Sequence, residues 1–340
     1  MIKSYLESIS EGNNLSIEEA YKVMHHIMNG ECNNSQIAGL ILALRTKGET
    51  PEEVAGFVKA MRDKSLKITS QHENTIDVCG TGGDGTNTFN ISTVASFVVA
   101  GAGVYVAKHG NRSVSSNSGS ADVLSHLGIN IDLLPELTER ALNEIGIAFM
   151  FAPVYHPAMK YAAKVRRELG IKTIFNILGP LTNPAGTKKQ LIGVFNNKTA
   201  KLMADAASYL DMERIVFLST ENSYDEISLS GVTKVYEYNL NKPLKEYEVD
   251  SKNFNLSEVN LNRIKSDSTE RNAEIFFSVL RDKIKDEAFF VVAANAAMAL
   301  HVAGLSENLV ECKNIAEESI LSGKAFEKFT ALKIFGEKHQ

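Results

Sequence analysis

The chain has 340 residues, 44% hydrophobic and 23% charged, which is typical of a globular protein large enough for two domains. Its formal net charge of -5 argues against a broad basic surface for nucleic acid or anionic membranes, so any anion site must be local. Three scattered cysteines, no signal pattern and no apolar segment of membrane length predict a cytoplasmic protein without disulfides.

Residues 1–68 predict a small unit made only of helices. Ser16 lies three residues before Glu19, and Thr50 three before Glu53, and both pairs are typical of capped helix starts. A further start near residue 34 gives three short helices with apolar faces. Helices this short cannot bury those faces alone, so we expect them to pack against the rest of the chain or another subunit.

Residues 72–340 predict an α/β unit, because apolar runs alternate with stretches of helical length and so favour a mainly parallel sheet. We expect helices from about 157–180 to join the N-terminal unit, residues 240–272 to form a surface excursion, and 289–304 and 315–326 to be two closing helices. The expected strands are 76–79, 104–107, 148–151, 190–195, 214–219 and 232–238.

A glycine-rich stretch follows the first expected strand and precedes a helix. Residues 80–85 contain four glycines, which allow positive φ and a close approach of a ligand to backbone N–H groups. The helix start behind them adds unpaired donors and a positive dipole end. The pattern favours a phosphate site over a glycine turn that merely ends a strand.

Two common phosphate motifs do not fit this loop. A dinucleotide site needs an acidic residue after the next strand, where the chain has Lys108 and His109. Asp84 lies inside the glycine turn and would repel a diphosphate unless it binds a ribose hydroxyl or faces a cation. No Gly-Lys-Ser/Thr follows the glycines, so the P-loop pattern fails too.

Polar residues flank the loop on both sides. Asn90, Ser92 and Thr93 are suited either to cap the next helix or to bind a terminal phosphate or a metal ion. Lys108 and Arg112 follow a buried strand on the same sheet edge, which favours an anion site over a solvated turn.

Two charged pairs lie further along the chain. Asp225 and Glu226 are adjacent acids in a loop; near a polyphosphate they become Mg²⁺ ligands, whereas elsewhere such a pair is usually solvated. Arg166 and Arg167 share a helix, and an arginine aimed into a cleft would bind a carboxylate in a bidentate fork. The sequence does not decide which arginine points inward.

Together these motifs resemble the anthranilate phosphoribosyltransferase family, which performs the second step of tryptophan biosynthesis from chorismate. The stretches Lys-His-Gly-Asn-Arg at 108–112 and Asn-Ile-Leu-Gly-Pro-Leu-Thr-Asn-Pro at 176–184 are the specific ones, and the resemblance covers nearly the whole chain. The glycine loop alone is shared with pyrimidine nucleoside phosphorylases of the same fold.

The resemblance implies a nucleoside phosphorylase/phosphoribosyltransferase-like fold, a homodimer formed through the helical domain, two Mg²⁺ ions and no dedicated catalytic base. It assigns phosphoribosyl diphosphate to Gly80, Gly82, Gly83, Asp84, Thr88, Asn90, Ser92, Thr93, Lys108 and Ser120. It assigns anthranilate to Gly80, His109, Asn111, His156 and Arg166, and the metal ions to Ser92, Asp225 and Glu226.

The chain departs from the family pattern at Tyr224, where a glycine is expected, and at Ser125-His126, where Glu-Ala is usual. Two alternatives stay open: a pyrimidine nucleoside phosphorylase-like enzyme, and a non-catalytic, nucleic-acid-binding relative of the same fold. Asn111 and Arg166, which suit an aromatic carboxylate, argue against the first, and the acidic net charge argues against the second.

Overall fold

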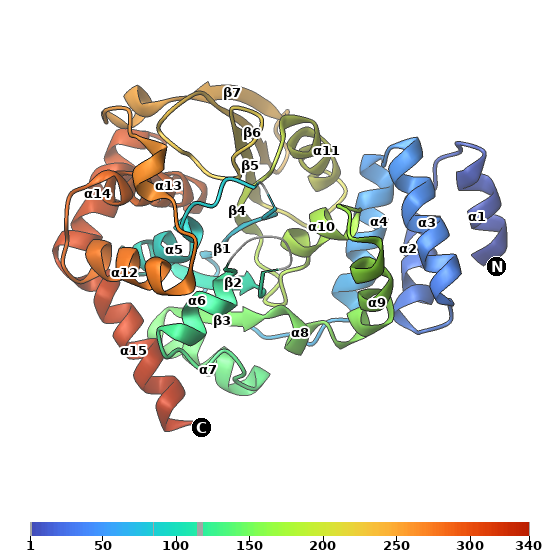
Figure 1. Cartoon of the computed structure of the whole chain (residues 1–340), viewed down its shortest axis with the longest axis horizontal. Helices are drawn as coiled ribbons and strands as arrows, with labels where there is room; N and C mark the ends of the chain where they lie inside the picture. The colour runs from blue at the N-terminus through green and yellow to red at the C-terminus, as the bar shows by residue number, and fades with distance from the viewer. Residues whose placement is uncertain (1, 84, 114–117, 340) are drawn as a thin grey trace.

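A helical unit and a larger α/β unit lie side by side in the computed structural model, which describes residues 2–83, 85–113 and 118–339 (Figure 1). The helical unit begins with four helices, one more than predicted, because an amphipathic first helix precedes the first capping box of the sequence. The capping boxes at Ser16–Glu19 and Thr50–Glu53 are both formed. The four helices are α1 (Ile2–Ser10), α2 (Ile17–Met28), α3 (Asn34–Lys47) and α4 (Pro51–Asp63).

A seven-stranded sheet forms the centre of the α/β unit, in the order β3-β2-β1-β4-β5-β6-β7. The first five strands in this order pair in parallel, whereas the β5-β6 and β6-β7 pairs are antiparallel, so the predicted mainly parallel sheet is confirmed. The strands are β1 (Thr75–Gly80), β2 (Tyr105–Gly110), β3 (Ile147–Phe151), β4 (Lys189–Gly193), β5 (Arg214–Thr220), β6 (Thr233–Asn239) and β7 (Lys245–Val249).

Helices cover both faces of the sheet, and two hydrophobic clusters fill the space between the layers. In β5, Val216 and Leu218 join one cluster, while Ile215 and Phe217 join the other, as strand alternation requires. The helices are α5 (Ile91–Gly101), α6 (Ser120–His126), α7 (Pro135–Ile145), α8 (Ala152–Tyr155), α9 (Lys160–Leu169), α10 (Phe175–Leu178), α11 (Asn197–Ala207), α12 (Thr269–Leu280), α13 (Glu287–Ala303), α14 (Leu309–Leu321) and α15 (Lys324–Lys338). Short 3-10 turns occupy Pro157–Met159, Gly179–Thr182, Ser251–Phe254 and Leu261–Ile264.

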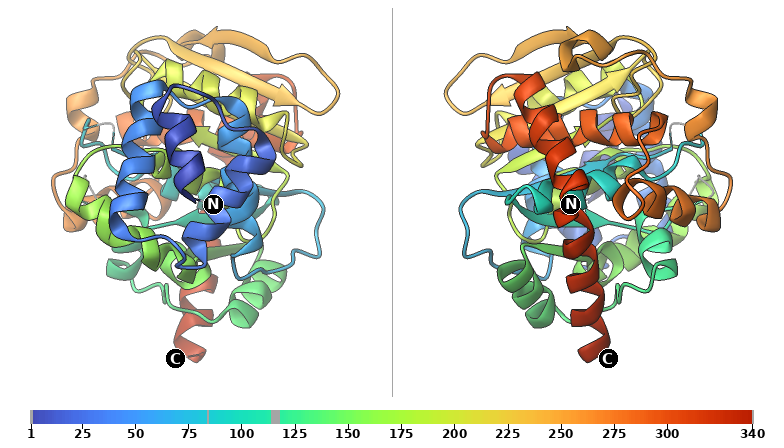
Figure 2. Two further views of the ribbon diagram at one scale, coloured as in Figure 1. Left: turned by 90° about the vertical axis from the view of Figure 1, so that its right-hand side faces the viewer. Right: turned by 90° about the vertical axis from the view of Figure 1, so that its left-hand side faces the viewer.

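The N-terminal helices share their hydrophobic cluster with α9, α10 and α11, so their apolar faces pack against the rest of the chain as expected. The C-terminal helices lie on the opposite side of the molecule. Figure 2 shows α1 to α4 (blue) nearest the viewer in one view and α15 (red) nearest in the other. Within the described ranges, no helix is both long and apolar enough to cross a membrane.

Three sequence predictions need correction. The helix expected at 315–326 is broken at Gly323, whose φ of 90° ends α14 and starts α15. The supposed surface excursion 240–272 contains β7, an edge strand that pairs with β6 and is mostly exposed, so its polar composition hid it. Lys108 and His109 belong to β2 itself, since that strand runs three residues beyond the predicted end.

Candidate active site

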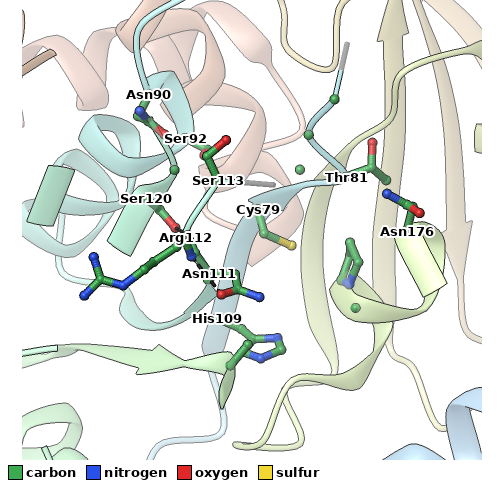
Figure 3. A pocket seen from close by; sticks show the side chains of 18 of the residues that line it. Cys79, Thr81, Asn90, Ser92, His109, Asn111, Arg112, Ser113, Ser120 and Asn176 are labelled. Carbon is green, nitrogen blue, oxygen red and sulfur yellow. Dashed lines mark hydrogen bonds between the residues drawn. The ribbon is translucent and has the colours of Figure 1, made fainter. Parts of the chain in front are cut away.

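A cavity of about 580 Å³ opens at the carboxyl edge of the parallel strands, where β1, β2 and β4 end. Ligands of open α/β sheets bind at this edge. Figure 3 shows Asn90, Ser92 and Ser120 on one side of the cavity and Thr81 and Asn176 across from them. The cavity therefore lies between the starts of α5 and α6 on one side and the wall formed by the glycine loop and α10 on the other.

The glycine loop takes the backbone conformation that its composition predicts. Gly82 and Gly83 have φ of 63° and 70°, a region that residues with a Cβ rarely adopt. Asp84 lies outside the described residues. The backbone N–H of Gly82 donates to Asp225 Oδ2 at 2.8 Å, so a loop 143 residues away in sequence contacts the glycines directly.

The two acidic side chains meet the loop and the start of α5. Glu226 Oε1 accepts a hydrogen bond from the Ser92 N–H at 3.1 Å. Buried Asn295 of α13 fixes the next residue, because its side chain both accepts from Ile227 N and donates to Ile227 O. The two acids are thus held at the glycine loop by hydrogen bonds to the backbone and by the contact between Asn295 and Ile227.

This donor set fits Mg²⁺, which prefers oxygen ligands and binds through one or two carboxylates plus substrate phosphates. The described residues contain no cluster of three or more His, Cys, Asp or Glu side chains that could hold a metal by itself. The two carboxylates and the Ser92 hydroxyl would therefore depend on oxygens of a bound ligand to complete a coordination shell.

Lys108 lies behind the loop and not at an exposed turn. Only 3% of its surface is accessible, and its Nζ donates to Val78 O at 2.7 Å and lies 3.4 Å from Ser92 Oγ. Burial lowers its pKa from the ordinary lysine value, and nearby Asp77 opposes that change. Arg112, the second expected cation, forms an ion pair with Asp122 at 3.0 Å.

Asp77 of β1 contacts both β2 and the 176–184 segment. Its carboxylate is fully buried and accepts hydrogen bonds from the backbone N–H of His109 at 3.2 Å and from Asn183 Nδ2 at 2.7 Å. Burial raises its pKa above the ordinary value. Asn183 also donates to Ala107 O, so the 176–184 segment is attached to β1 and β2.

Two buried imidazoles lie on the side of the cavity away from the acids. The rings of His109 and His156 are 5.1 Å apart between centroids. Burial lowers the pKa of His109 well below 6.5 and that of His156 to about 4, so both rings are neutral at pH 7. The two rings are tilted by 50° to each other and add no charge to this end of the cavity.

Arg166 supplies the cation at that end. It lines the cavity and its guanidinium lies 5.3 Å from the centroid of the Phe175 ring, whereas Arg167 is exposed and outside the lining. Burial lowers the pKa of Arg166. Of the two arginines, Arg166 is therefore the one that faces the cavity.

Both units of the chain match family models. Residues 3–65 match the helical bundle domain of a glycosyl transferase family, and residues 72–326 match the α/β domain of that family. An anthranilate phosphoribosyltransferase of Salinibacter ruber is 43% identical over 97% of both chains. One from Acetivibrio thermocellus is 46% identical over 96% of this chain and 94% of its own.

The chain belongs to the anthranilate phosphoribosyltransferase family.

Solved structures of this family have the same fold. The enzyme of Thermus thermophilus superposes with a TM-score of 0.92 at 37% identity, covering 98% of this chain and 99% of its own. The Saccharomyces cerevisiae enzyme in complex with phosphoribosyl diphosphate and Mg gives 0.91 at 27% identity, over 99% and 98% of the two chains. The yeast enzyme has also been solved with 4-fluoroanthranilate, at a TM-score of 0.88 and 26% identity.

The cavity brings together most of the predicted site residues. Thr93 is an exception: it is fully buried in the first turn of α5 and does not line the cavity. The predicted residues that do line it are Gly80, Gly82, Gly83, Thr88, Asn90, Ser92, Lys108, His109, Asn111, Ser120, His156, Arg166, Asp225 and Glu226.

The sequence prediction missed part of the lining. Ser266 and Asn272 come from the polar region that was expected to be a surface excursion, yet both are buried at the cavity. Asn176 begins the 176–184 segment that carries the family resemblance, and Phe175 precedes it, but no rule of spacing marked either residue as lining the cavity. Near Asn272, the local sequence indicated only a helix start, through the Ser268 cap of α12, and not a place at the cavity.

Neither departure from the family pattern disturbs the site. Tyr224 takes part in a turn closed by two backbone hydrogen bonds with Thr220, both 2.9 Å, and its φ is not positive. A glycine is therefore not required there. Ser125 and His126 are exposed at the end of α6, away from the cavity.

The buried imidazoles should make the protein less stable in acid. Because the pKa of His156 is about 4 in the folded state and 6.5 ordinarily, the unfolded chain binds more protons between these values. The free energy of unfolding should fall as the pH is lowered from 6.5 to 4, by about 3 kcal/mol for His156 alone. Urea unfolding at several pH values would measure the slope.

The control for this slope is His156→Asn, which removes the titrating ring and should flatten the slope in part, since His109 remains. Substitution of exposed His126 by asparagine should leave the slope as it is in the wild type. Equal slopes for wild type and His156→Asn would contradict the prediction.

Proposed function

We propose that this protein transfers the 5-phosphoribosyl group from phosphoribosyl diphosphate to the amine of anthranilate, giving N-(5-phosphoribosyl)anthranilate and diphosphate, the second step of tryptophan biosynthesis. Family membership supports this reaction. The observation that carries it is one cavity with two unlike ends: a glycine loop with two carboxylates at one, and neutral rings with Arg166 at the other.

The first end suits a phosphoribosyl diphosphate. The residues proposed to bind this substrate are Gly80, Gly82, Gly83, Thr88, Asn90, Ser92, Lys108 and Ser120, all of which line the cavity. Asp84, which lies outside the described residues, is proposed to bind it as well. Backbone N–H groups of the loop and the Lys108 ammonium would bind the anionic oxygens. Thr93 is left out of the set because of its buried position.

Ser92, Asp225 and Glu226 are proposed to hold Mg²⁺, with two ions expected. When bound, Mg²⁺ supplies positive charge that stabilises the departing diphosphate. The chain's own contribution is to fix the acids on the glycine loop and on the first turn of α5, so that they are in place before the ligand binds.

The second end suits anthranilate. Arg166 would form a bidentate fork with the carboxylate, and His109, His156, Asn111 and Gly80 would line the path of the ring and its amine. Neutral imidazoles suit an aromatic ring because they add no charge beside it. The guanidinium is held in a partly desolvated place, where its attraction for a carboxylate is stronger than in water.

In the reaction, the C1–O bond to diphosphate breaks and the nitrogen lone pair of anthranilate forms the new bond to C1. The aromatic amine is neutral at pH 7, so it needs no base before it attacks. Its proton leaves afterwards to the diphosphate or to water, since an imidazole with a pKa of about 4 is a poor acceptor. The protein holds nitrogen and C1 in line, about 3 to 3.5 Å apart.

We also propose how the two units of the chain move and assemble. Residues 1–68, joined by 157–180, would act as one body and close on residues 72–340, since α9 packs on α2 and α3 and lines the cavity. The helical body would also form the homodimer, where the exposed Leu42 of α3 is an apolar contact. Free cysteines support a cytoplasmic location.

The test is consumption of anthranilate by purified protein with Mg²⁺ and phosphoribosyl diphosphate, followed by the loss of anthranilate fluorescence. No consumption, together with phosphorolysis of a pyrimidine nucleoside, would instead assign the phosphorylase reaction. No transfer together with salt-dependent binding of DNA would assign the nucleic-acid-binding role.

Arg166→Ala should raise the KM for anthranilate by about 10- to 100-fold, because it removes a charge-assisted hydrogen bond to the carboxylate. The kcat should change much less. Initial rates at varied anthranilate measure both constants. Arg167→Ala is the matched control, as its side chain is exposed on the same helix. If the two variants gave the same KM, Arg166 would not be the carboxylate partner.

A further inference from the structure

Asn272 lies near the start of α12 and is 4% exposed. Its Oδ1 accepts from the backbone N–H of Asn90 at 2.8 Å, and its Nδ2 donates to the backbone carbonyl of Ser268 at 2.9 Å and to Ser266 Oγ at 2.8 Å. A backbone N–H only donates and a carbonyl only accepts. These partners therefore fix which end of the Asn272 amide faces Asn90.

This orientation in turn fixes the side chain of Asn90. Asn90 Nδ2 donates one hydrogen bond to Asn272 Oδ1 at 3.0 Å and the other to the Ser118 carbonyl at 3.1 Å. Both acceptors demand the NH₂ end of the amide, so its two hydrogens are used. The carbonyl oxygen of Asn90 is left for the cavity, and no donor to it exists in the described part of the chain.

Two more contacts hold the segment before α12 against the loop that precedes α5. The Ser266 N–H donates to Asn87 O at 2.8 Å, and the Phe89 N–H donates to Ile264 O at 3.0 Å. Asn272 is thus the side chain that connects this joined pair of segments to the residue at the start of α5.

A carbonyl oxygen only accepts hydrogen bonds, so it favours a ligand group that can donate one. At neutral pH, the phosphate oxygens of phosphoribosyl diphosphate are acceptors and cannot donate to Asn90, whereas the hydroxyls on C2 and C3 of the ribose can. We propose that Asn272 is a positioning residue, which turns the Asn90 carbonyl toward a ribose hydroxyl and so sets recognition of the sugar. This inference rests on the transferase function proposed above.

A double-mutant cycle tests the coupling. Asn272→Leu and Asn90→Ala should each raise the KM for phosphoribosyl diphosphate by about 10-fold, the loss of one hydrogen bond, with a smaller change in kcat. The double variant should be no worse than Asn90→Ala alone, because Asn272 acts through Asn90. Asn262→Leu, at an exposed position of the preceding segment, should behave as wild type. Additive effects, or a larger effect of Asn272→Leu than of Asn90→Ala, would overturn the proposal.

If Asn272→Leu does not fold, Ser266→Ala replaces it, since that change removes only one of the groups that orient Asn272. It should raise the KM in the wild-type background and have no effect in the Asn90→Ala background. An equal rise in both backgrounds would overturn the proposal.

The sugar itself is tested with the 2-deoxy and 3-deoxy analogues of phosphoribosyl diphosphate. Wild type should discriminate against one of them, and both Asn90→Ala and Asn272→Leu should lose that discrimination. Discrimination that survives in the variants, or a change only in their Mg²⁺ requirement, overturns the assignment to ribose. An inactive wild type would instead refute the transferase function, whereas an active wild type with additive substitutions refutes only the role of Asn272.

Discussion

Replacing Asp225 by asparagine and Glu226 by glutamine together should lower kcat/KM for phosphoribosyl diphosphate by about three orders of magnitude. Amides are neutral, so the variant loses the charge that would hold Mg²⁺ beside the departing diphosphate. The fold should persist, because each new side chain keeps an oxygen that can accept from the N–H of Gly82 or Ser92.

Initial rates as a function of Mg²⁺ concentration measure this effect, and calorimetry measures binding of the Mg²⁺-substrate complex. The expected result is a much higher Mg²⁺ requirement together with the lower rate. Glu221→Gln is the matched control: Glu221 lies in the same loop, but its carboxylate accepts from Val232 N on the outer side. An unchanged Mg²⁺ dependence in the double variant would show that the acids position the loop and do not bind the metal.

The meeting of these acids with the glycine loop could be predicted from sequence because both follow strands of one sheet. Carboxyl ends of parallel strands share an edge, so the ends of β1, β2 and β5 bring their loops together whatever lies between. The continuous apolar run Ile-Val-Phe-Leu at 215–218 in β5 likewise predicts a strand covered on both faces. These inferences need only local pattern and a general rule of topology.

Other features depend on contacts that no local pattern encodes. Asn90 and Asn272 are 182 residues apart, and nothing in the polar run before α12 indicates that it returns to the cavity. Which of Arg166 and Arg167 faces the cavity depends on how α9 is rotated against its neighbours, and Arg166 contacts the Phe175 ring. The burial of Thr93 could not be predicted, because a residue at a helix start can face either the cavity or the interior, and here it is fully buried and outside the lining.

Gly193 offers a test of how the sheet positions the acids. It is the last residue of β4, paired with Gly80, and a Cβ placed on it would lie 1.5 Å from the backbone oxygen of Asp225. That oxygen belongs to the main chain and cannot rotate away as a side chain would. By comparison, a Cβ on Gly80 would meet the Asp225 carboxylate oxygen at 2.7 Å, which a change of rotamer could relieve.

Gly193→Ala should therefore push the loop that holds Asp225 and Glu226 away from β4. Overpacking of this kind costs about 1–3 kcal/mol of stability, and a displacement near 1 Å in a catalytic group can lower kcat by roughly 100-fold. We expect both effects, measured by urea unfolding and by initial rates at saturating substrates. Activity close to wild type would mean that the acids do not need the position that β4 imposes on them.

A matched alanine substitution separates steric displacement from the general effect of removing a glycine. Gly39 lies inside α3, where an added Cβ would come no closer than 3.9 Å to Leu6, and its φ is not positive. Gly39→Ala should stabilise the protein by about 1 kcal/mol, because alanine favours a helix over glycine, and should leave the rate unchanged. Loss of activity in Gly193→Ala but not in Gly39→Ala would connect catalysis to the close contact between β4 and the acidic loop.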